Sequence, residues 1–369
     1  MPGNYKMIRE LNKSAVMNII RVHKSVSKTQ IAKETGLSAN AVGMITARLI
    51  EKGYVFVKSR GESSGGRKPE LLSLTPGIHH AIGIDIDVDR IRFAVVDIAG
   101  NIVQKSRVKI NCVGDPKPVF ATIGKALEQL TPQNLLGIGL AVAGQVDVSQ
   151  KVILSAPNLK WNQVDLKQLL PSNVPIFVEN EAMASAIYEH LNGCCQKNKN
   201  FICVNSKSGI GAGIFINGQI YRGSTGCAGE IGHMVVEPDG LPCPCGSRGC
   251  LEIYASSRGI INAAGTQDIQ QAVSLAQDGN ETVHSIFRQA ARYLGIVLAG
   301  LVNALNPEKI VLGKEFAKYD TLILEEVRSV IVQKALPTAC QNLEIIISPE
   351  DENSSVLGAA YLPLDQLVF

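Results

Sequence analysis

Two passages of the chain repeat one order of strands and turns. Residues 81–104 read as strand, turn, strand, turn, strand, with the second turn at Gly100-Asn101. Residues 201–221 follow the same plan, with a turn at 207–209 and an Asn-Gly turn at Asn217-Gly218. Asn-Gly between strand-forming runs is a strong hairpin signal, because both residues tolerate the positive φ of a tight turn. The repeat therefore favours a body made of two similar lobes.

Helices and strands alternate after each passage, which is typical of α/β folds. The predicted elements are 118–130, 136–142, 166–170 and 176–178 in the first half, and 281–305, 310–312 and 344–347 in the second. We therefore expect two α/β lobes, residues 77–198 and residues 199–369. Architectures of this kind bind ligands in the cleft between their lobes.

Length and composition agree with several packed domains. The chain has 369 residues, of which 46% are hydrophobic, and this is too long for a single core. Nine scattered cysteines, and no N-terminal apolar run before a cleavage site, predict a protein of the reducing cytoplasm. The longest apolar runs, Leu135–Val146 and Tyr293–Leu305, fall short of the ~20 residues that cross a bilayer. We expect them in buried core, and no membrane partner.

Charge is distributed unevenly along the chain. Residues 1–75 hold 13 Lys plus Arg against 5 Asp plus Glu, a net +8, whereas the remainder holds 23 against 28, a net −5. Lys and Arg neutralise phosphates, so the N-terminal segment is expected to bind a polyanion. A basic surface that is merely solvated is the alternative.

The basic segment, residues 1–76, has the pattern of a winged helix-turn-helix. Apolar residues at helical spacing predict a first helix over Ser14–Val22. A second helix begins at Ser27, where Ser-Lys-Thr-Gln has the form of a capping box, and it ends at Gly36. A third helix is expected from Ser38 to Lys52. The side of this helix that faces the other two is formed by Val42, Ile45, Leu49 and Ile50.

The third helix is predicted to be the recognition helix that enters a major groove. Strands follow at 54–57 and 70–74, around a basic stretch, 58–68, that forms the tip of a β-wing. Small three-helix modules also bind proteins, but the charge favours DNA. The side chains expected at the DNA are Ser27, Thr29, Ser38, Asn40, Thr46, Arg48, Arg60, Arg67 and Lys68. Their register on the bases stays open.

A short stretch of the body has the spacing of a metal site. From His233 to Cys250 the chain reads His-x9-Cys-x-Cys-x4-Cys, so the candidate ligands are His233, Cys243, Cys245 and Cys250. Zinc takes imidazole nitrogen and thiolate sulfur in a tetrahedron, and four protein ligands leave no position for an activated water. We therefore predict structural zinc. The alternative, cysteines buried as small hydrophobes, fits poorly with the Pro and Gly residues between them.

Three passages resemble the ROK family of repressors, open reading frames and kinases, and the resemblance covers nearly the whole chain. They are Pro157–Trp161, Val178–Ala182 and Gly226–Glu252, the last with Gly-Glu-Ile-Gly-His and Cys-x-Cys-Gly-x-x-Gly-Cys-Leu-Glu. The resemblance implies an α/β protein with the two-lobed, actin-like (ribonuclease H-like) sugar kinase fold. The winged helix-turn-helix indicates the repressor branch, similar to the xylose, glucose and N-acetylglucosamine regulators.

The resemblance also implies which residues contact a sugar. They are Asn158, Asn180, Glu181, Glu230, His233 and Glu252. His233 is expected to ligate zinc with one ring nitrogen and to donate from the other to a hydroxyl. Glu181 stands where the kinases have Asp. Its extra methylene moves the carboxylate, and ~1 Å can cost ~100-fold in rate, so we interpret it as a hydroxyl acceptor rather than a base or a solvated helix-start residue. Glu237 and Asp239 are expected to lie in solvated loop.

The phosphate turns differ from those of the kinases. The kinases' Asp-x-Gly-Gly-Thr is Asp85-Ile-Asp-Val-Asp here, and these carboxylates would repel a triphosphate. The second turn, Gly-Thr-Gly-Ile-Gly, is residues 207–211, with Lys-Ser at its first two positions, and the nucleotide-side Gly-Gly is Gly313-Lys314. Phosphoryl transfer needs a backbone cradle for the phosphates, so we expect no kinase activity.

We therefore expect a cytoplasmic, dimeric repressor with operator DNA and a free monosaccharide as its partners and with no catalytic residue. Xylose is favoured, because Asn180-Glu181 resembles the xylose-responsive repressors. Two alternatives remain. One is a sugar kinase with a regulatory DNA-binding head, and the other is a repressor whose effector is a phosphosugar or a phosphotransfer protein.

Overall fold

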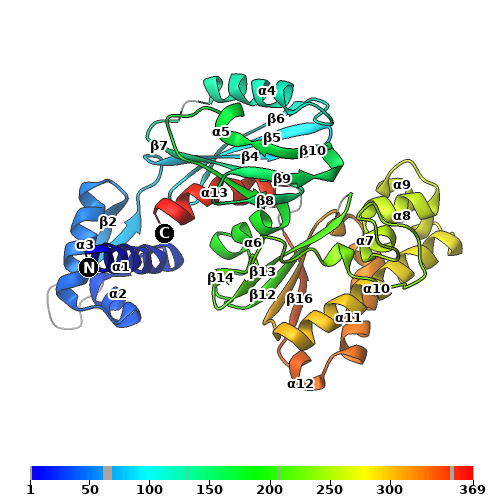
Figure 1. The fold of residues 1–369 in the computed structure, drawn as a ribbon. Helices are drawn as coiled ribbons and strands as arrows, with labels where there is room; N and C mark the ends of the chain where they lie inside the picture. The colour runs from blue at the N-terminus through cyan, green and yellow to red at the C-terminus, as the bar shows by residue number, and fades with distance from the viewer. Residues whose placement is uncertain (1, 61–68, 131, 207, 350–352, 369) are drawn as a thin grey trace. The chain divides into compact units, whose positions relative to one another are not determined.

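The computed structural model describes residues 2–60, 69–130, 132–206, 208–349 and 353–368 (Figure 1). The chain packs as two compact units, each assembled from separate stretches. The first unit is 1–140, 165–178 and 359–369, and the second is 141–164 and 179–358. These divisions differ from the expected boundaries after residues 76 and 198, so the predicted domain ranges stay predictions.

The N-terminal part of the first unit has three helices and a small sheet. Its elements are α1 (Pro2–His23), β1 (Val26–Ser27), α2 (Lys28–Thr35), α3 (Ala39–Glu51), β2 (Val55–Arg60) and β3 (Glu70–Leu74), with the strand order β1-β3-β2. The core between the helices is formed by Val16, Met17, Ile20, Ile31, Val42 and Leu49, all at most 2% exposed. Helix α1 begins well before the predicted start at Ser14, and the other elements agree with the predicted order.

Serine hydroxyls cap the N-termini of α2 and α3. Ser27 Oγ accepts a hydrogen bond from the Gln30 amide, and Ser38 Oγ accepts one from the Ala41 amide, both at 3.2 Å. The part of the predicted capping box in which the Gln30 side chain bonds back to the start of the helix is wrong. The Gln30 side chain donates instead to Glu34 Oε1, one turn further on, at 3.0 Å. The hydroxyl alone caps α2.

The body of the first unit is a five-stranded sheet. Its elements are β4 (His80–Ile86), β5 (Arg90–Asp97), β6 (Ile102–Lys109), β7 (Leu135–Val142) and β11 (Ile176–Asn180), in the order β11-β7-β4-β5-β6, with α4 (Pro116–Gln129), α5 (Leu166–Leu169) and the C-terminal end of α13 (Ser354–Leu367). Helix α4 covers one face of the sheet (Figure 1). Helix α13 packs directly on β7, because Gly139 has no side chain: a Cβ there would lie 1.8 Å from the Ala359 carbonyl oxygen.

The second unit repeats the antiparallel hairpin of the first. Its main sheet has the order β14-β13-β12-β15-β16, from β12 (Phe201–Ser206), β13 (Ile210–Ile216), β14 (Gln219–Ile220), β15 (Lys309–Lys314) and β16 (Glu344–Ile347). A small sheet has the order β10-β9-β8, from β8 (Gln145–Asp147), β9 (Val152–Ala156) and β10 (Trp161–Asp165). Strands β12 and β13 are antiparallel, whereas β12 and β15 are parallel.

Helices surround this second sheet. They are α6 (Glu181–Leu191), α7 (Leu251–Ala255), α8 (Ser257–Ala264), α9 (Ile269–Gln277), α10 (Glu281–Leu305), α11 (Asp320–Lys334) and α12 (Pro337–Cys340), with the short 3-10 turns η1 (Pro157–Leu159), η2 (Ile231–His233) and η3 (Glu315–Lys318). Among the described helices, α10 alone is long and apolar enough to cross a bilayer. Its Phe287, Leu294 and Leu298 are nevertheless at most 1% exposed and belong to the core of this unit, as expected for buried apolar sequence.

Candidate functional site

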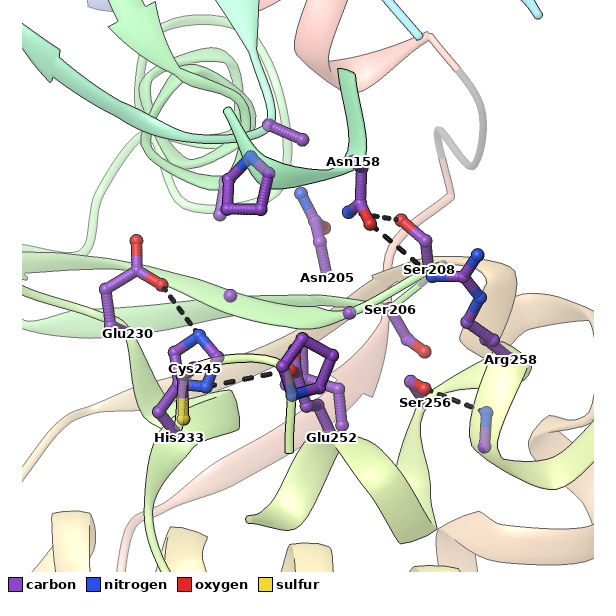
Figure 2. Close-up of a pocket in the computed structure, with 18 of the residues that line it drawn as sticks. Asn158, Asn205, Ser206, Ser208, Glu230, His233, Cys245, Glu252, Ser256 and Arg258 are labelled. Carbon is purple, nitrogen blue, oxygen red and sulfur yellow. Dashed lines mark hydrogen bonds and ion pairs between the residues drawn. The ribbon is translucent and has the colours of Figure 1, made fainter. Parts of the chain in front are cut away.

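One pocket of the second unit brings together all of the residues predicted to contact a sugar. Its volume is about 260 Å³, and its lining includes Asn158, Asn180, Glu181, Glu230, His233 and Glu252. Every lining residue belongs to the second unit. Sites for drug-sized ligands usually exceed ~300 Å³, so this pocket suits a smaller molecule. Figure 2 shows its polar side chains.

Asn180 is held in place by both ends of its amide. Its Oδ1 accepts hydrogen bonds from the Ala182 and Met183 amides at 2.8 and 3.3 Å and so caps α6. Its Nδ2 donates to the Gly144 carbonyl at 2.9 Å. The cap directs the N-terminus of α6, and with it the half-buried Glu181, at the pocket. Asn180 therefore shapes the pocket as well as lining it.

Asn158 forms another edge of the pocket with Ser208 and Arg258, two residues that the sequence did not indicate as sugar contacts. Its Nδ2 donates to Ser208 Oγ at 3.1 Å, and Arg258 donates to its Oδ1 at 3.4 Å (Figure 2). Arg258 is exposed and lies near the start of α8, just after the capping residue Ser256. The only sequence signal for Arg258 is this position beside a helix N-terminus.

Asn205 was also missed as a pocket residue. It lines the pocket from β12 and is 4% exposed. Neither its Oδ1 nor its Nδ2 has a hydrogen-bond partner among the described residues. Leaving a buried amide unpaired costs about 1–3 kcal/mol, which a ligand hydroxyl would recover.

The other side of the pocket carries two carboxylates and an imidazole. Glu230 Oε2 lies 3.9 Å from His233 Nε2, and Glu252 Oε1 lies 3.6 Å from His233 Nδ1. Burial raises the pKa of Glu230; Glu252 adds to this effect, and His233 opposes it. Gly209 also lines the pocket, and a Cβ there would lie 2.7 Å from Glu252 Oε2. Carboxylates and an imidazole at this spacing can accept from and donate to neighbouring hydroxyls.

The predicted metal ligands form one cluster next to this side of the pocket. His233, Cys243, Cys245 and Cys250 could hold a metal ion, since their ligand atoms all lie within 4.8 Å of one another. Cys245 Sγ is 3.7 Å from Cys250 Sγ, and Cys243 Sγ is 3.7 Å from His233 Nδ1. Zn–S bonds of ≈ 2.3 Å in a tetrahedron separate two sulfurs by about 3.8 Å, close to the Cys245–Cys250 distance, so the chemistry of the donor set fits zinc.

Glu237 and Asp239 lie outside the pocket. Both are exposed, and Glu237 Oε2 accepts a hydrogen bond from the Tyr293 hydroxyl at 2.8 Å. This bond ties the loop between the candidate ligands His233 and Cys243 to α10. Glu237 thus has a structural contact that the sequence did not indicate.

The turn between β4 and β5, in the first unit, is occupied by its own hydrogen bonds. Asp85 is 1% exposed, and Arg92 donates to its Oδ2 from Nη2 at 2.6 Å and from Nε at 3.0 Å. The Asp87 amide donates to the Arg90 carbonyl at 3.0 Å, and the Val88 amide donates to Asp87 Oδ1 at 2.8 Å. The amides of Asp87 and Val88 are thus bonded within the hairpin. In the second turn, residue 207 lies outside the described residues.

Helix α3 exposes a different set of side chains from the predicted one. Thr46 is wrong as a DNA contact, because it is fully buried and its Oγ1 donates to the Val42 carbonyl at 2.8 Å. Ile50, predicted to face the other helices, is 37% exposed. Thr29, Ser38, Asn40 and Arg48 are exposed as expected, although Ser27 and Ser38 use their hydroxyls as caps. The wing residues Arg67 and Lys68, and the side chain of Arg60, lie outside the described part of the chain.

The fold and the pocket define a class: α/β proteins of the sugar kinase fold preceded by a helix-turn-helix segment. The chain belongs to the ROK family, whose model matches residues 81–366. It is 31% identical to the "Xylose repressor" of Caldicellulosiruptor bescii, over 99% of this chain and 98% of that protein. A crystal structure of a ROK family transcriptional regulator, a homologue of the E. coli MLC protein, covers 97% of this chain and 96% of its own, with a TM-score of 0.85 at 24% identity.

A kinase of the family matches only the body of the chain. The ROK glucokinase of Streptomyces griseus, solved with glucose and AMPPNP, has a TM-score of 0.68 and 27% identity, and it covers 77% of this chain and 98% of its own. The predicted fold class is therefore confirmed.

Proposed function

We propose that this protein is a sugar-responsive transcriptional repressor of carbohydrate-utilisation genes that acts in the cytoplasm as a homodimer. The observation that carries the proposal is the pocket of about 260 Å³ in which amides, carboxylates and an imidazole converge. The basic N-terminal segment, with a net charge of +8, supplies the contact to operator DNA. A relative that bears the name "Xylose repressor" matches this segment and the body together.

A free monosaccharide is the proposed effector, with xylose first. The pocket is small, and its carboxylates Glu230 and Glu252 suit hydroxyls better than a phosphate. The unpaired amide of Asn205 provides one more donor and one more acceptor for a hydroxyl. The name of the Caldicellulosiruptor bescii relative agrees with xylose.

Zinc is the proposed metal, and its role is structural. The four ligands of the cluster leave no open position for chemistry on a bound water. His233 would ligate through Nδ1, which lies 3.7 Å from Cys243 Sγ, and its Nε2 would then stay free for Glu230 or a sugar hydroxyl. The metal would thus fix one wall of the pocket.

Phosphoryl transfer is not part of the proposal. A kinase needs free backbone amides at its phosphate turns, whereas the amides of Asp87 and Val88 are bonded within their own hairpin. The carboxylate of Asp89 is paired with Arg90 at the same turn. A sugar kinase with a DNA-binding head is the second candidate, because the kinase fold is intact.

Sugar and DNA are coupled in this proposal. Two reading heads of a dimer would contact half-sites about one helical turn apart, and sugar binding would change their spacing. Each ligand would then weaken the other by the same factor. To test this coupling, duplexes that the protein binds are selected from a randomised 30-bp library. The complex of the protein with a selected duplex is then titrated with sugars.

Release of the selected duplex by xylose, or by another free monosaccharide, is the expected result. Unchanged DNA affinity with all aldoses, amino sugars and their phosphates would overturn the proposal. Release by a phosphosugar alone would move the effector to that class. Saturable ATP binding with sugar-dependent formation of ADP would favour the kinase.

A further inference from the structure

The outward face of α3 is a continuous stripe with little charge. Asn40, Met44 and Ala47 are all exposed, and they follow one another by four and three residues, the spacing of a single helix face. Met44 is 56% exposed. The inward face of the helix is fixed by Val42, Thr46 and Leu49, which are buried, so the stripe cannot rotate into the core.

This stripe lies in the most basic part of the chain. Residues 1–75 carry 13 Lys plus Arg against 5 Asp plus Glu. Single exposed hydrophobic residues need no explanation by themselves. Met44, however, lies between two polar side chains of the same helix, Asn40 and Arg48, that make no hydrogen bond or ion pair with any residue that the structure describes. A polyanion with apolar groups on its surface fits this combination.

We infer that α3 reads A·T base pairs in the major groove. The Asn40 amide matches the N6 donor and N7 acceptor of adenine, a pairing that the major groove offers at no other base. Met44 and Ala47 match the C5-methyl group of thymine, the only methyl group in that groove. Arg48, near the C-terminal end of the stripe, is then available to a phosphate.

The inference rests on the proposed function, because it requires that this segment binds duplex DNA. It goes further by assigning the specificity-determining residues and the bases that they select. Thr46, which the sequence analysis predicted at the DNA together with Asn40 and Arg48, is excluded by its burial. A protein partner on the same stripe is the competing occupant, and the charge of the segment disfavours it.

Replacing thymine by deoxyuridine tests the methyl contact, since it removes one methyl group and nothing else. Sites are selected from the randomised library with the wild-type chain, and the thymines of the consensus are then replaced by dU one at a time. Loss of one buried methyl group weakens binding by about fourfold. Met44→Ala should discriminate less between the dT and dU duplexes, because only Ala47 is then left to contact the methyl group.

Asn40 is tested in the same way with 7-deazaadenine, which lacks the N7 acceptor. We expect wild type to lose about 5-fold or more at one adenine of each half-site, and Asn40→Ala to be indifferent to the replacement. Met7→Ala is the matched control, because Met7 on α1 is 64% exposed and outside the stripe; it should keep the wild-type response to dU. Alanine favours helix, so neither variant should unfold α3.

The outcomes distinguish a failure of the proposed function from a failure of the base readout. If wild type retains no duplex, the proposed function and the base readout fail together. If it retains duplexes whose half-sites lack A·T pairs, or if Met44→Ala responds to dU as wild type does, only the readout is overturned. The readout is supported by a consensus with A·T positions, together with a smaller response of Met44→Ala to dU and no response of Asn40→Ala to 7-deazaadenine.

Discussion

His233 presents its two ring nitrogens to different groups: Nδ1 lies 3.7 Å from Sγ of Cys243, and Nε2 lies 3.9 Å from Oε2 of Glu230. His233 therefore belongs to both the metal cluster and the pocket, as does Cys245. A metal on Nδ1 would fix the ring plane and keep Nε2 protonated as a donor. The stability of the cluster and the affinity for a sugar should consequently change together.

Loss of one ligand of the metal cluster should weaken the binding of both zinc and sugar. Cys245→Ser removes an exposed thiol of the cluster, and we expect zinc affinity to fall by more than about tenfold, with weaker xylose binding and a lower melting temperature. Zinc content by mass spectrometry and calorimetry with xylose measure the two effects. Cys227→Ser is the control, because Cys227 lies outside the cluster and should keep wild-type values. Unchanged sugar affinity in zinc-free protein would refute the coupling.

Asn180 and Glu181 should differ in what their substitution costs. Asn180→Ala removes the cap of α6 and the bond to Gly144, and we expect the free energy of unfolding to fall by about 2 kcal/mol. Glu181→Gln keeps the cap and should change stability much less, while xylose affinity falls about tenfold, because a charged acceptor is lost. Denaturant titration and calorimetry separate the two. Equal losses of stability in both variants would contradict this division.

Arg92 should be far more important to the first unit than Arg90. Arg92→Ala leaves the carboxylate of Asp85, which is 1% exposed, without its guanidinium, and we expect a loss of about 3 kcal/mol. Arg90→Ala breaks a pair in which Asp89 is 54% exposed, worth at most about 1 kcal/mol. Urea denaturation of both variants gives the comparison. Similar midpoints would show that the buried pair is not a stabilising contact.

Thr46→Val should leave the choice of DNA sequence unchanged. The Thr46 hydroxyl donates to the carbonyl of Val42 inside the helix bundle, so its loss affects stability by about 1 kcal/mol and not base readout. Selection on the randomised library should return the wild-type consensus. A shifted consensus would mean that Thr46 reaches the bases.

Elements and motifs that have a local sequence pattern of their own could be predicted. Helix α10 matches the predicted bounds Glu281–Leu305, and the metal ligands come together because Pro and Gly turns leave the chain between them few alternatives. The error at Thr46 was one of helix rotation. Thr46 follows Val42 by four residues and precedes Leu49 by three, which places it on the buried stripe, but its polarity suggested exposure.

Contacts between distant parts of the chain could not be read from the sequence. Arg258 reaches Asn158 across 100 positions, and no local pattern announces such a pair. Asn205 looks like any other residue of a hairpin strand until the fold places its unpaired amide in the lining of a pocket. These residues complete the edge of the pocket beside Asn158, whereas the family motifs supplied mainly the side with the two carboxylates and the imidazole.

Calorimetric titration of xylose into the free protein and into its complex with the selected duplex measures whether sugar binding and DNA binding are coupled. We expect DNA to weaken xylose binding by the same factor by which xylose weakens DNA binding, because the two equilibria share one protein. The same xylose affinity with and without DNA would contradict this expectation, as would heat of binding from ATP and none from any sugar.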